Sequence, residues 1–266
     1  MQDRSFAGVE QCDIFIYGDK GLSEESVPII REVSLGIFLD GIEMVSIACN
    51  GNYLRELAVG FLRSEGFIGT ASDIKRIDMS DDGGAVHIFT KDAIPQQKRQ
   101  PCEPDTIASS GSRGWKRENN TQRREDLSAR KIFISVKNVF SLMKKFVDLS
   151  RLHQVTGGTH SAALAHGDRI LTVREDIGRH NTIDMLGGYA VLKGIDCSDK
   201  IILRTGRVSA EIVHKVWNLK IPVMISLSVP TSMAVQLCRE AGITLIGSVR
   251  GEKMKGSVRA TTVWAV

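Results

Sequence analysis

The stretch REDIGRHN, residues 174–181, gathers charged side chains around a glycine. It contributes Arg174, Arg179 and His180, and it stands between the apolar run RILTV and a segment with helical periodicity near residues 181–193. Arginine donates charge-assisted hydrogen bonds to oxyanions, histidine can carry a proton near neutral pH, and Gly178 lets the backbone bend. These residue types favour an anionic ligand.

Short apolar runs alternate with helical patterns through the second half of the chain. Strands are predicted at 200–205, 222–228 and 243–249, and helices are predicted at 135–150, 209–220 and 232–242. This alternation is typical of βαβ units that build a largely parallel sheet. The sequence therefore predicts an α/β domain over residues 128–266.

The loops that follow these strands would meet at one edge of such a sheet. If the strand RILTV and the three later strands all run parallel, a ligand binds outside their carboxyl ends. The residues that these loops offer to a phosphate-bearing ligand are Arg174, Arg179, His180, Gly206, Arg207, Thr231, Arg250, Gly251 and Lys253. Ser209 and Thr231 or Ser232 are candidate caps of helices whose N-termini favour an anion. The alternative is that these residues are ordinary caps and solvated arginines.

The first half of the chain predicts a smaller α+β domain, residues 1–127. Asp40-Gly41 lies between two apolar runs in 34–49 and is typical of a hairpin, while 52–66 has helical spacing and 73–90 suggests a second hairpin. The domain ends in residues 91–127, which carry three prolines, many charges and little aliphatic bulk. Such a composition predicts a mobile loop between the domains.

The bulk properties exclude several classes of protein. The 266 residues carry a net charge of +4, which permits an anionic ligand but does not demand nucleic acid. No apolar run is long enough for a membrane helix, and the N-terminus lacks the layout of a signal peptide, so we expect a cytoplasmic protein that contacts no membrane. The five cysteines form no CxxC pair and the zinc-deaminase signature is missing, so no metal site is predicted.

Five segments resemble the formate dehydrogenase accessory sulfurtransferase family of the FdhD/NarQ type. They are CNGNYLRELAVGFLRSEGFI, VTGGTHSAAL, VREDIGRHNTIDMLGG, ILRTGRVSAEIVHKV and VPTSMAVQLCREAGITLIGSVRG. The resemblance implies a cytoplasmic homodimer that passes sulfur from a cysteine desulfurase to the molybdenum cofactor, in its bis-guanine-dinucleotide form, before the cofactor enters formate dehydrogenase. It also implies a second domain with a three-layer, cytidine-deaminase-like fold. The family's cofactor-binding segment falls on Ser248, Val249, Arg250, Gly251, Glu252 and Lys253.

The chain departs from the family pattern where a cysteine pair is expected. The equivalent slot, within Ser109–Gly114, holds no cysteine, and a serine cannot carry a sulfane sulfur. The nearest thiol is Cys102, in the same polar segment and close to two cations. Two functions stay open: sulfur transfer with Cys102 as the catalytic thiol, or a cofactor-binding chaperone that has lost the sulfur chemistry.

Overall fold

The computed structural model describes residues 7–19, 21–92, 100–101, 115–116, 125–130, 132–251 and 253–257. Most of the predicted loop at 91–127, including Cys102 and the Ser109–Gly114 slot, lies outside these residues, as does Glu252. Between residues 93 and 124 the structure describes only a short strand pair, β7 (Gln100–Pro101) with β8 (Trp115–Lys116).

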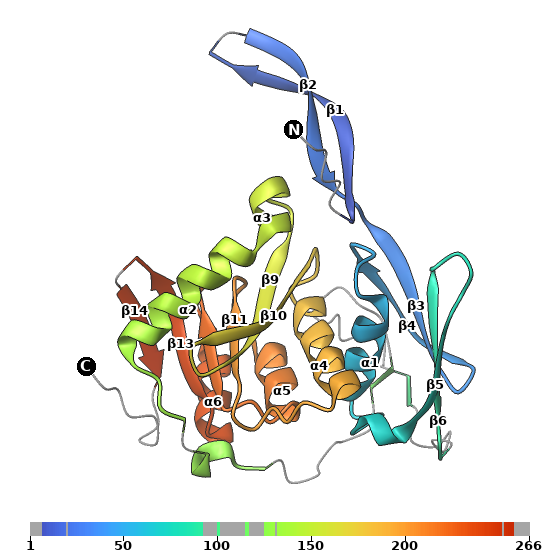
Figure 1. Cartoon of the computed structure of the whole chain (residues 1–266), viewed down its shortest axis with the longest axis vertical. Coiled ribbons are helices and arrows are strands. Elements are labelled where there is room, and N and C mark those ends of the chain that lie inside the picture. The colour runs from blue at the N-terminus through green and yellow to red at the C-terminus, as the bar shows by residue number, and fades with distance from the viewer. Residues whose placement is uncertain are drawn as a thin grey trace.

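A six-stranded sheet forms the larger lobe of the molecule (Figure 1). Its order is β10 (Arg169–Asp176), β9 (His160–His166), β11 (Ile201–Arg204), β12 (Val223–Ser226), β13 (Thr244–Arg250) and β14 (Lys253–Ser257). Strands β11, β12 and β13 are parallel neighbours, which confirms that part of the prediction. Strand β9 is antiparallel to both β10 and β11. β10 therefore points the same way as β11, and the carboxyl ends of four strands share one edge.

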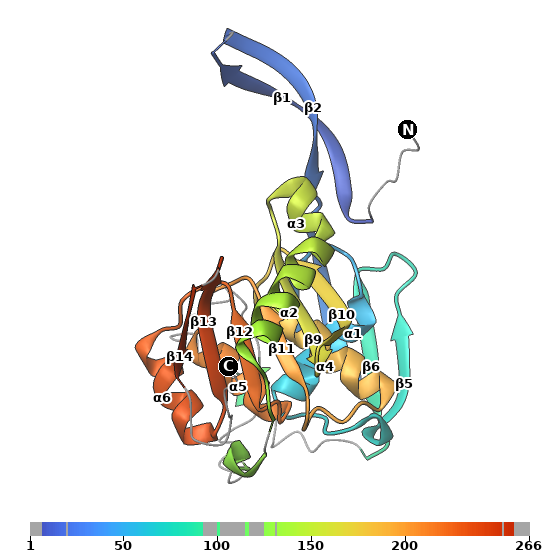
Figure 2. The same cartoon turned by 60° about the vertical axis from the view of Figure 1, so that its left-hand side comes forward.

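Helices cover both faces of this sheet (Figures 1 and 2). On one face lies α2 (Val136–Leu149), followed by α3 (Arg151–Thr156), and on the other lie α4 (Asn181–Lys193), α5 (Ala210–Asn218) and α6 (Ser232–Ala241). The strand period of two divides β11 between the faces: Ile201 and Leu203 join the α2 side, and Ile202 joins the α5 side. Arg204, two residues after Ile202, therefore points toward α5.

The smaller lobe is a four-stranded sheet with one helix. Its strand order is β4 (Ile42–Cys49), β3 (Val33–Leu39), β6 (Ala85–Thr90) and β5 (Ile74–Met79), and it is covered by α1 (Leu54–Ser64). A 3₁₀ turn, Ala71–Asp73, leads into β5, and another, Leu127–Ala129, precedes α2. The predicted hairpin turn is confirmed, since Asp40 and Gly41 have φ of 48° and 82°.

The two lobes meet where α1 crosses α4. Two glycines allow this approach, because a Cβ on Gly60 would lie 1.6 Å from the Asp184 carbonyl oxygen, and one on Gly188 would lie 1.8 Å from that of Glu56. Met185 of α4 belongs to the core of the smaller lobe. The two lobes thus share α4, and the division into domains at residues 127 and 128 stays a prediction.

An N-terminal hairpin extends away from both lobes (Figures 1 and 2). It pairs β1 (Val9–Gly18) with β2 (Gly21–Ile30) along their whole length. The sequence pattern does not predict this hairpin. The mixed α/β class is confirmed, and the likeness to the cytidine deaminase fold stays a prediction. None of the helices in the described ranges is both long and apolar enough to cross a bilayer.

Candidate functional site

An arginine is buried at the carboxyl end of β11. Arg204 is 1% exposed, its Nε donates to the Gly206 carbonyl oxygen at 3.1 Å, and its Nη1 has no hydrogen-bond partner among the described residues. Burial, together with the charge of Arg179, lowers the pKa of Arg204 to about 9. A buried cation normally has an anionic partner, and no described carboxylate forms an ion pair with this one.

Gly206 packs closely beside this arginine. A Cβ at position 206 would lie 3.1 Å from Arg204 Nη2, 3.4 Å from Arg179 Cβ and 3.4 Å from His160 Nδ1. Gly206 does not have a positive φ, so the backbone conformation does not require glycine there. Packing favours glycine there, because a larger residue would crowd the side chains of Arg204, Arg179 and His160. Burial lowers the pKa of His160, and the charges of Arg204 and Arg179 add to that shift.

Two buried hydroxyl groups on neighbouring segments of the chain also lack hydrogen-bond partners among the described residues. Thr159 Oγ1, one residue before His160, and Ser209 Oγ, three residues after Gly206, are both buried and unpaired in the described part of the chain. Ser209 is the N-cap residue of α5, as predicted, but its side chain does not cap the helix. Sequence reasoning missed Arg204 and Thr159 and gave His160 no role. The sequence did carry a signal for Arg204, because it follows Ile202 by two residues and so shares the buried face of the strand.

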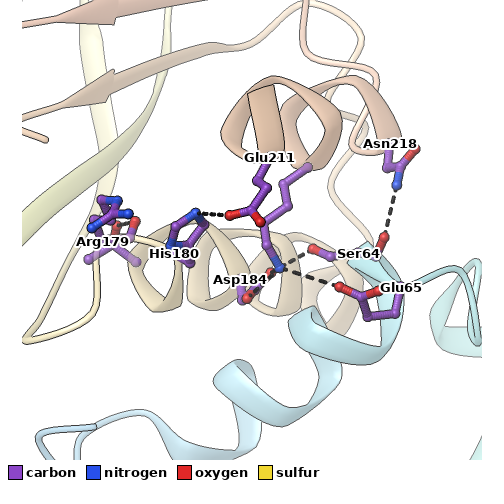
Figure 3. Close-up of polar contacts among 9 residues, drawn as sticks. Ser64, Glu65, Arg179, His180, Asp184, Glu211 and Asn218 are labelled. Carbon is purple, nitrogen blue, oxygen red and sulfur yellow. Dashed lines mark hydrogen bonds and ion pairs between the residues drawn. The ribbon is translucent and has the colours of Figure 1, made fainter. Parts of the chain in front are cut away.

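A chain of buried polar contacts starts at His180 (Figure 3). His180 Nε2 lies 3.0 Å from Glu211 Oε2, at ion-pair distance but outside hydrogen-bond angles. Lys215 Nζ lies 2.8 Å from both Asp184 carboxylate oxygens, and Ser64 Oγ donates to Asp184 at 2.6 Å. His180 therefore turns toward α5 and toward the junction of the lobes.

Arg174 pairs with the neighbouring lobe, and its contact with a ligand stays a prediction. Its Nε and Nη2 contact the Glu56 carboxylate at 2.5 Å and 2.9 Å. Its guanidinium lies over the rings of Tyr53 and Tyr189, 4.0 Å and 5.1 Å from their centroids. Arg174 thus links β10 to α1 and α4, because its side chain points at the smaller lobe.

The segment 248–253 forms the turn from β13 to β14. Ser248 has φ of 55°, and its backbone N–H donates to the Ser228 carbonyl oxygen at 3.0 Å. Arg250, Gly251 and Lys253 are exposed, whereas Val249 packs in the core beneath α2. A cleft of about 470 Å³ opens here, and it is lined by Val136, Phe140, Ser248, Lys253, Met254 and Lys255.

The remaining predicted residues are Arg179, Gly206, Arg207 and Thr231. Arg179 and Gly206 lie with Arg204 on the α5 side of the sheet. Arg207 is exposed in the loop after β11. Thr231 caps α6, since its Oγ1 accepts from the Ala234 N–H at 3.2 Å. The structure thus brings the strand-end loops to one edge, but it separates their cations between the two faces of the sheet.

Three of the described thiols are buried and hard to ionise. Burial raises the pKa of Cys49 and of Cys197 to about 11, and that of Cys238 to about 12. Cys12, on β1, is partly exposed. A thiol with such a raised pKa is a poor nucleophile near neutral pH.

Comparisons with known proteins agree on one family. The FdhD/NarQ family profile matches residues 30–256. The chain is 33% identical over 230 residues to a protein of Shouchella clausii, covering 85% of this chain and 86% of that one, and 32% identical over 240 residues to one of Bacillus subtilis, covering 90% and 91%. Both relatives bear the name sulfur carrier protein FdhD.

A solved structure has the same fold. It comes from Desulfotalea psychrophila, is named as a formate dehydrogenase accessory protein, and matches with a TM-score of 0.77 at 21% identity, covering 96% of this chain and 99% of that one. The profile match over residues 30–256 and the identity to full-length relatives together show that this chain belongs to the FdhD/NarQ family.

Proposed function

We propose that the protein carries sulfur from a cysteine desulfurase to the molybdenum cofactor, in its bis-guanine-dinucleotide form, during the maturation of formate dehydrogenase. We place this activity in the cytoplasm and assign it to a homodimer. The names of the relatives and of the solved neighbour support the general role. The cofactor is the client of the protein rather than a resident group.

The observation that carries the cofactor part of the proposal is the cleft beside residues 248–253. It combines two ammonium groups, Lys253 and Lys255, with the ring of Phe140 and the side chain of Met254. Ammonium groups suit phosphate oxygens, and an aromatic ring suits the face of a purine base. This cleft fits one guanine nucleotide end of such a client better than it fits an uncharged ligand.

The thiol that would carry the sulfur is Cys102. Cys49, Cys197 and Cys238 are unsuited, because burial keeps them protonated and removes them from contact with a partner protein. In the proposed step, the Cys102 thiolate attacks the outer sulfur of the desulfurase persulfide. The sulfur–sulfur bond of the desulfurase breaks, its thiolate leaves, and Cys102 holds the persulfide.

The second candidate function is a cofactor-binding chaperone without sulfur chemistry. The absence of cysteine from Ser109–Gly114 favours it. Both functions use the same cleft, so the fate of sulfur distinguishes them.

The deciding experiment is an intact mass measurement after incubation with a cysteine desulfurase and cysteine. We expect the chain to gain the mass of one sulfur atom, and we expect Cys102→Ser to abolish that gain. Cys12→Ser is the matched control, because Cys12 is the described thiol that is partly exposed. A gain that survives in Cys102→Ser and disappears in Cys12→Ser contradicts the assignment. No gain in the unaltered chain favours the chaperone.

A further inference from the structure

We propose that the N-terminal hairpin of one copy of the chain docks on the strand-end edge of a second copy, against a surface formed by Arg207, Val229 and Met233. The strand-end edge is the edge of the six-stranded sheet where β10, β11, β12 and β13 end. The inference rests on the homodimer of the proposed function and assigns the two surfaces that form it.

The first argument is the charge of the hairpin. Residues 9–30 hold five carboxylates and one cation, which gives the segment a net charge of −4. They are Glu10, Asp13, Asp19, Glu24, Glu25 and Lys20. Because the whole chain carries +4, the other residues together carry +8. Opposite charge therefore favours the hairpin of one copy against the body of another, and like charge disfavours hairpin against hairpin.

The second argument is that one face of the hairpin combines apolar and acidic side chains. The register places Phe15 opposite Glu24 and Tyr17 opposite Leu22, and paired residues share a face, as do residues two apart on one strand. Glu25 lies on the other face. The first face therefore presents an apolar strip with a carboxylate beside it, and it suits an apolar surface that carries a cation.

The turns after β11 and β12 offer such a surface. Val229 and Met233, at the start of α6, are each 53% exposed, and Arg207 is exposed in the turn after β11. The Val208 N–H donates to the Val229 carbonyl oxygen at 3.2 Å, and the Thr231 N–H donates to that of Val208 at 2.9 Å, so the two turns lie side by side. Exposed apolar side chains next to a cation complement the acidic, apolar face of the hairpin.

The third argument is that the hairpin leaves the body of the protein at the same edge. Asn52 Nδ2 donates to the Ala7 carbonyl oxygen at 2.9 Å, just before β1, and the Asn50 N–H donates to Asp176 Oδ2 at 2.9 Å, at the end of β10. Strands of ten residues reach about 30 Å, and they extend away from both lobes (Figures 1 and 2).

This placement suits a two-fold axis. Two copies whose strand-end edges face each other can each lay a hairpin on the other, so that the axis makes the same contact twice. The strand-end edge of each copy is then bordered by the hairpin of its partner.

The test measures the Kd of the dimer by sedimentation of the full chain. Glu24→Lys places a cation on the apolar face of the hairpin and should raise the Kd of the dimer by at least about tenfold. Glu25→Lys is the matched control, because it makes the same change of charge one residue away on the other face, and we expect it to change the Kd by no more than about twofold. Equal weakening in both variants would show an effect of net charge alone and would overturn the assignment of the face.

A charge swap identifies the surface on the second copy. Arg207→Glu alone should weaken the dimer as Glu24→Lys does, and the two substitutions together should restore most of the lost affinity, because the pair is again oppositely charged. Arg239→Glu, in the last turn of α6, is the control and should not rescue Glu24→Lys. A double variant whose two losses simply add would place the docking surface elsewhere.

The outcomes also separate this inference from the proposed function. If the dimer forms and keeps its Kd in both Glu24→Lys and Arg207→Glu, the docking inference is wrong and the homodimer stands. If the unaltered chain sediments as a monomer, the homodimer and the docking inference both fail. The gain of sulfur mass, measured on the same samples, tests the sulfur carrier independently of either result.

Discussion

His180 is a buried imidazole held in its neutral form. Burial lowers its pKa to about 4, with a contribution from the charge of Lys215 that the Glu211 carboxylate partly opposes. Lys215 remains charged: burial alone would lower its pKa, but Asp184 and Glu65 outweigh that effect and raise it. His180, next to the predicted ligand loop, therefore belongs to the junction between α4 and α5. Because it stays neutral in the folded protein, it makes the free energy of unfolding depend on pH.

Acid should destabilise the protein through this histidine. Below the unfolded pKa of about 6.5, the unfolded chain binds a proton that folded His180 does not accept until about pH 4, so stability is fully present above this window and is lost as the pH falls through it. Between pH 7 and pH 4 we expect the unaltered chain to lose on the order of 2–3 kcal/mol more than His180→Gln. Urea unfolding at stepped pH measures this difference.

The control is His166→Gln, since His166 is exposed at the end of β9 beside Asp199. It should follow the unaltered chain through the same pH window. Parallel stability curves for His180→Gln and the unaltered chain would show that the imidazole titrates normally.

Helix α4 is the element that both lobes share. Ile183, Leu186 and Ala190 face the core of the larger lobe, and Met185 faces the core of the smaller one. Its approach to α1 is so close that carbonyl oxygens occupy the places where a side chain on Gly60 or Gly188 would begin. The helix that starts at the functional edge is thereby fixed on both sides.

Two adjacent glycines on α4 should respond in opposite ways to the same substitution. Gly188→Ala places a methyl group 1.8 Å from the Glu56 backbone oxygen, and we expect a loss of about 3 kcal/mol or more in the free energy of unfolding. In Gly187→Ala the new methyl group lies 3.0 Å from the movable end of the Leu219 side chain. We expect this substitution to raise the free energy of unfolding by up to about 1 kcal/mol, because alanine favours a helix over glycine. Chemical denaturation measures both. Equal effects would mean that the α1–α4 crossing can relax.

Elements with a local signal were predictable from the sequence. The Asp40-Gly41 turn, the helix predicted over 135–150 and the alternation of strands and helices after residue 200 all appear in the fold. The antiparallel β9 between β10 and β11 was not predictable, because its position depends on non-local pairing. The N-terminal hairpin was missed because its strands mix charged and apolar residues without a buried face.

The strand-end loops were predictable from the sequence, and the partners of their side chains were less so. The rule that ligands meet the carboxyl ends of parallel strands selected Arg179, Gly206 and the 248–253 turn. The same reasoning overlooked Arg204, because an arginine at the end of a strand is normally solvated. It also assigned Arg174 to the ligand, and only the position of α1 reveals its partner, Glu56.

On the scale of the whole molecule, the N-terminal hairpin has too little contact with the rest of the chain to be stabilised by it. A two-stranded ribbon is marginal in water on its own. Phe15 and Tyr17 are 69% and 84% exposed on one face, and Leu22 lies opposite Tyr17 on that same face. A ribbon that carries such an apolar strip is typical of an interface, and the homodimer that we propose would cover it with a second copy of the chain.

This interface should be open to disruption without loss of the fold. Phe15→Ser combined with Tyr17→Ser should shift the protein from dimer to monomer in sedimentation. The Tm of this monomeric variant should equal that of the unaltered monomer, because the hairpin adds little to the cores of the two lobes. Phe133→Ser is the control, since Phe133 is equally exposed, at 67%, but lies on the body of the protein ahead of α2. A double variant that still sediments as a dimer would place the interface elsewhere, and an unaltered chain that sediments as a monomer would contradict the homodimer itself.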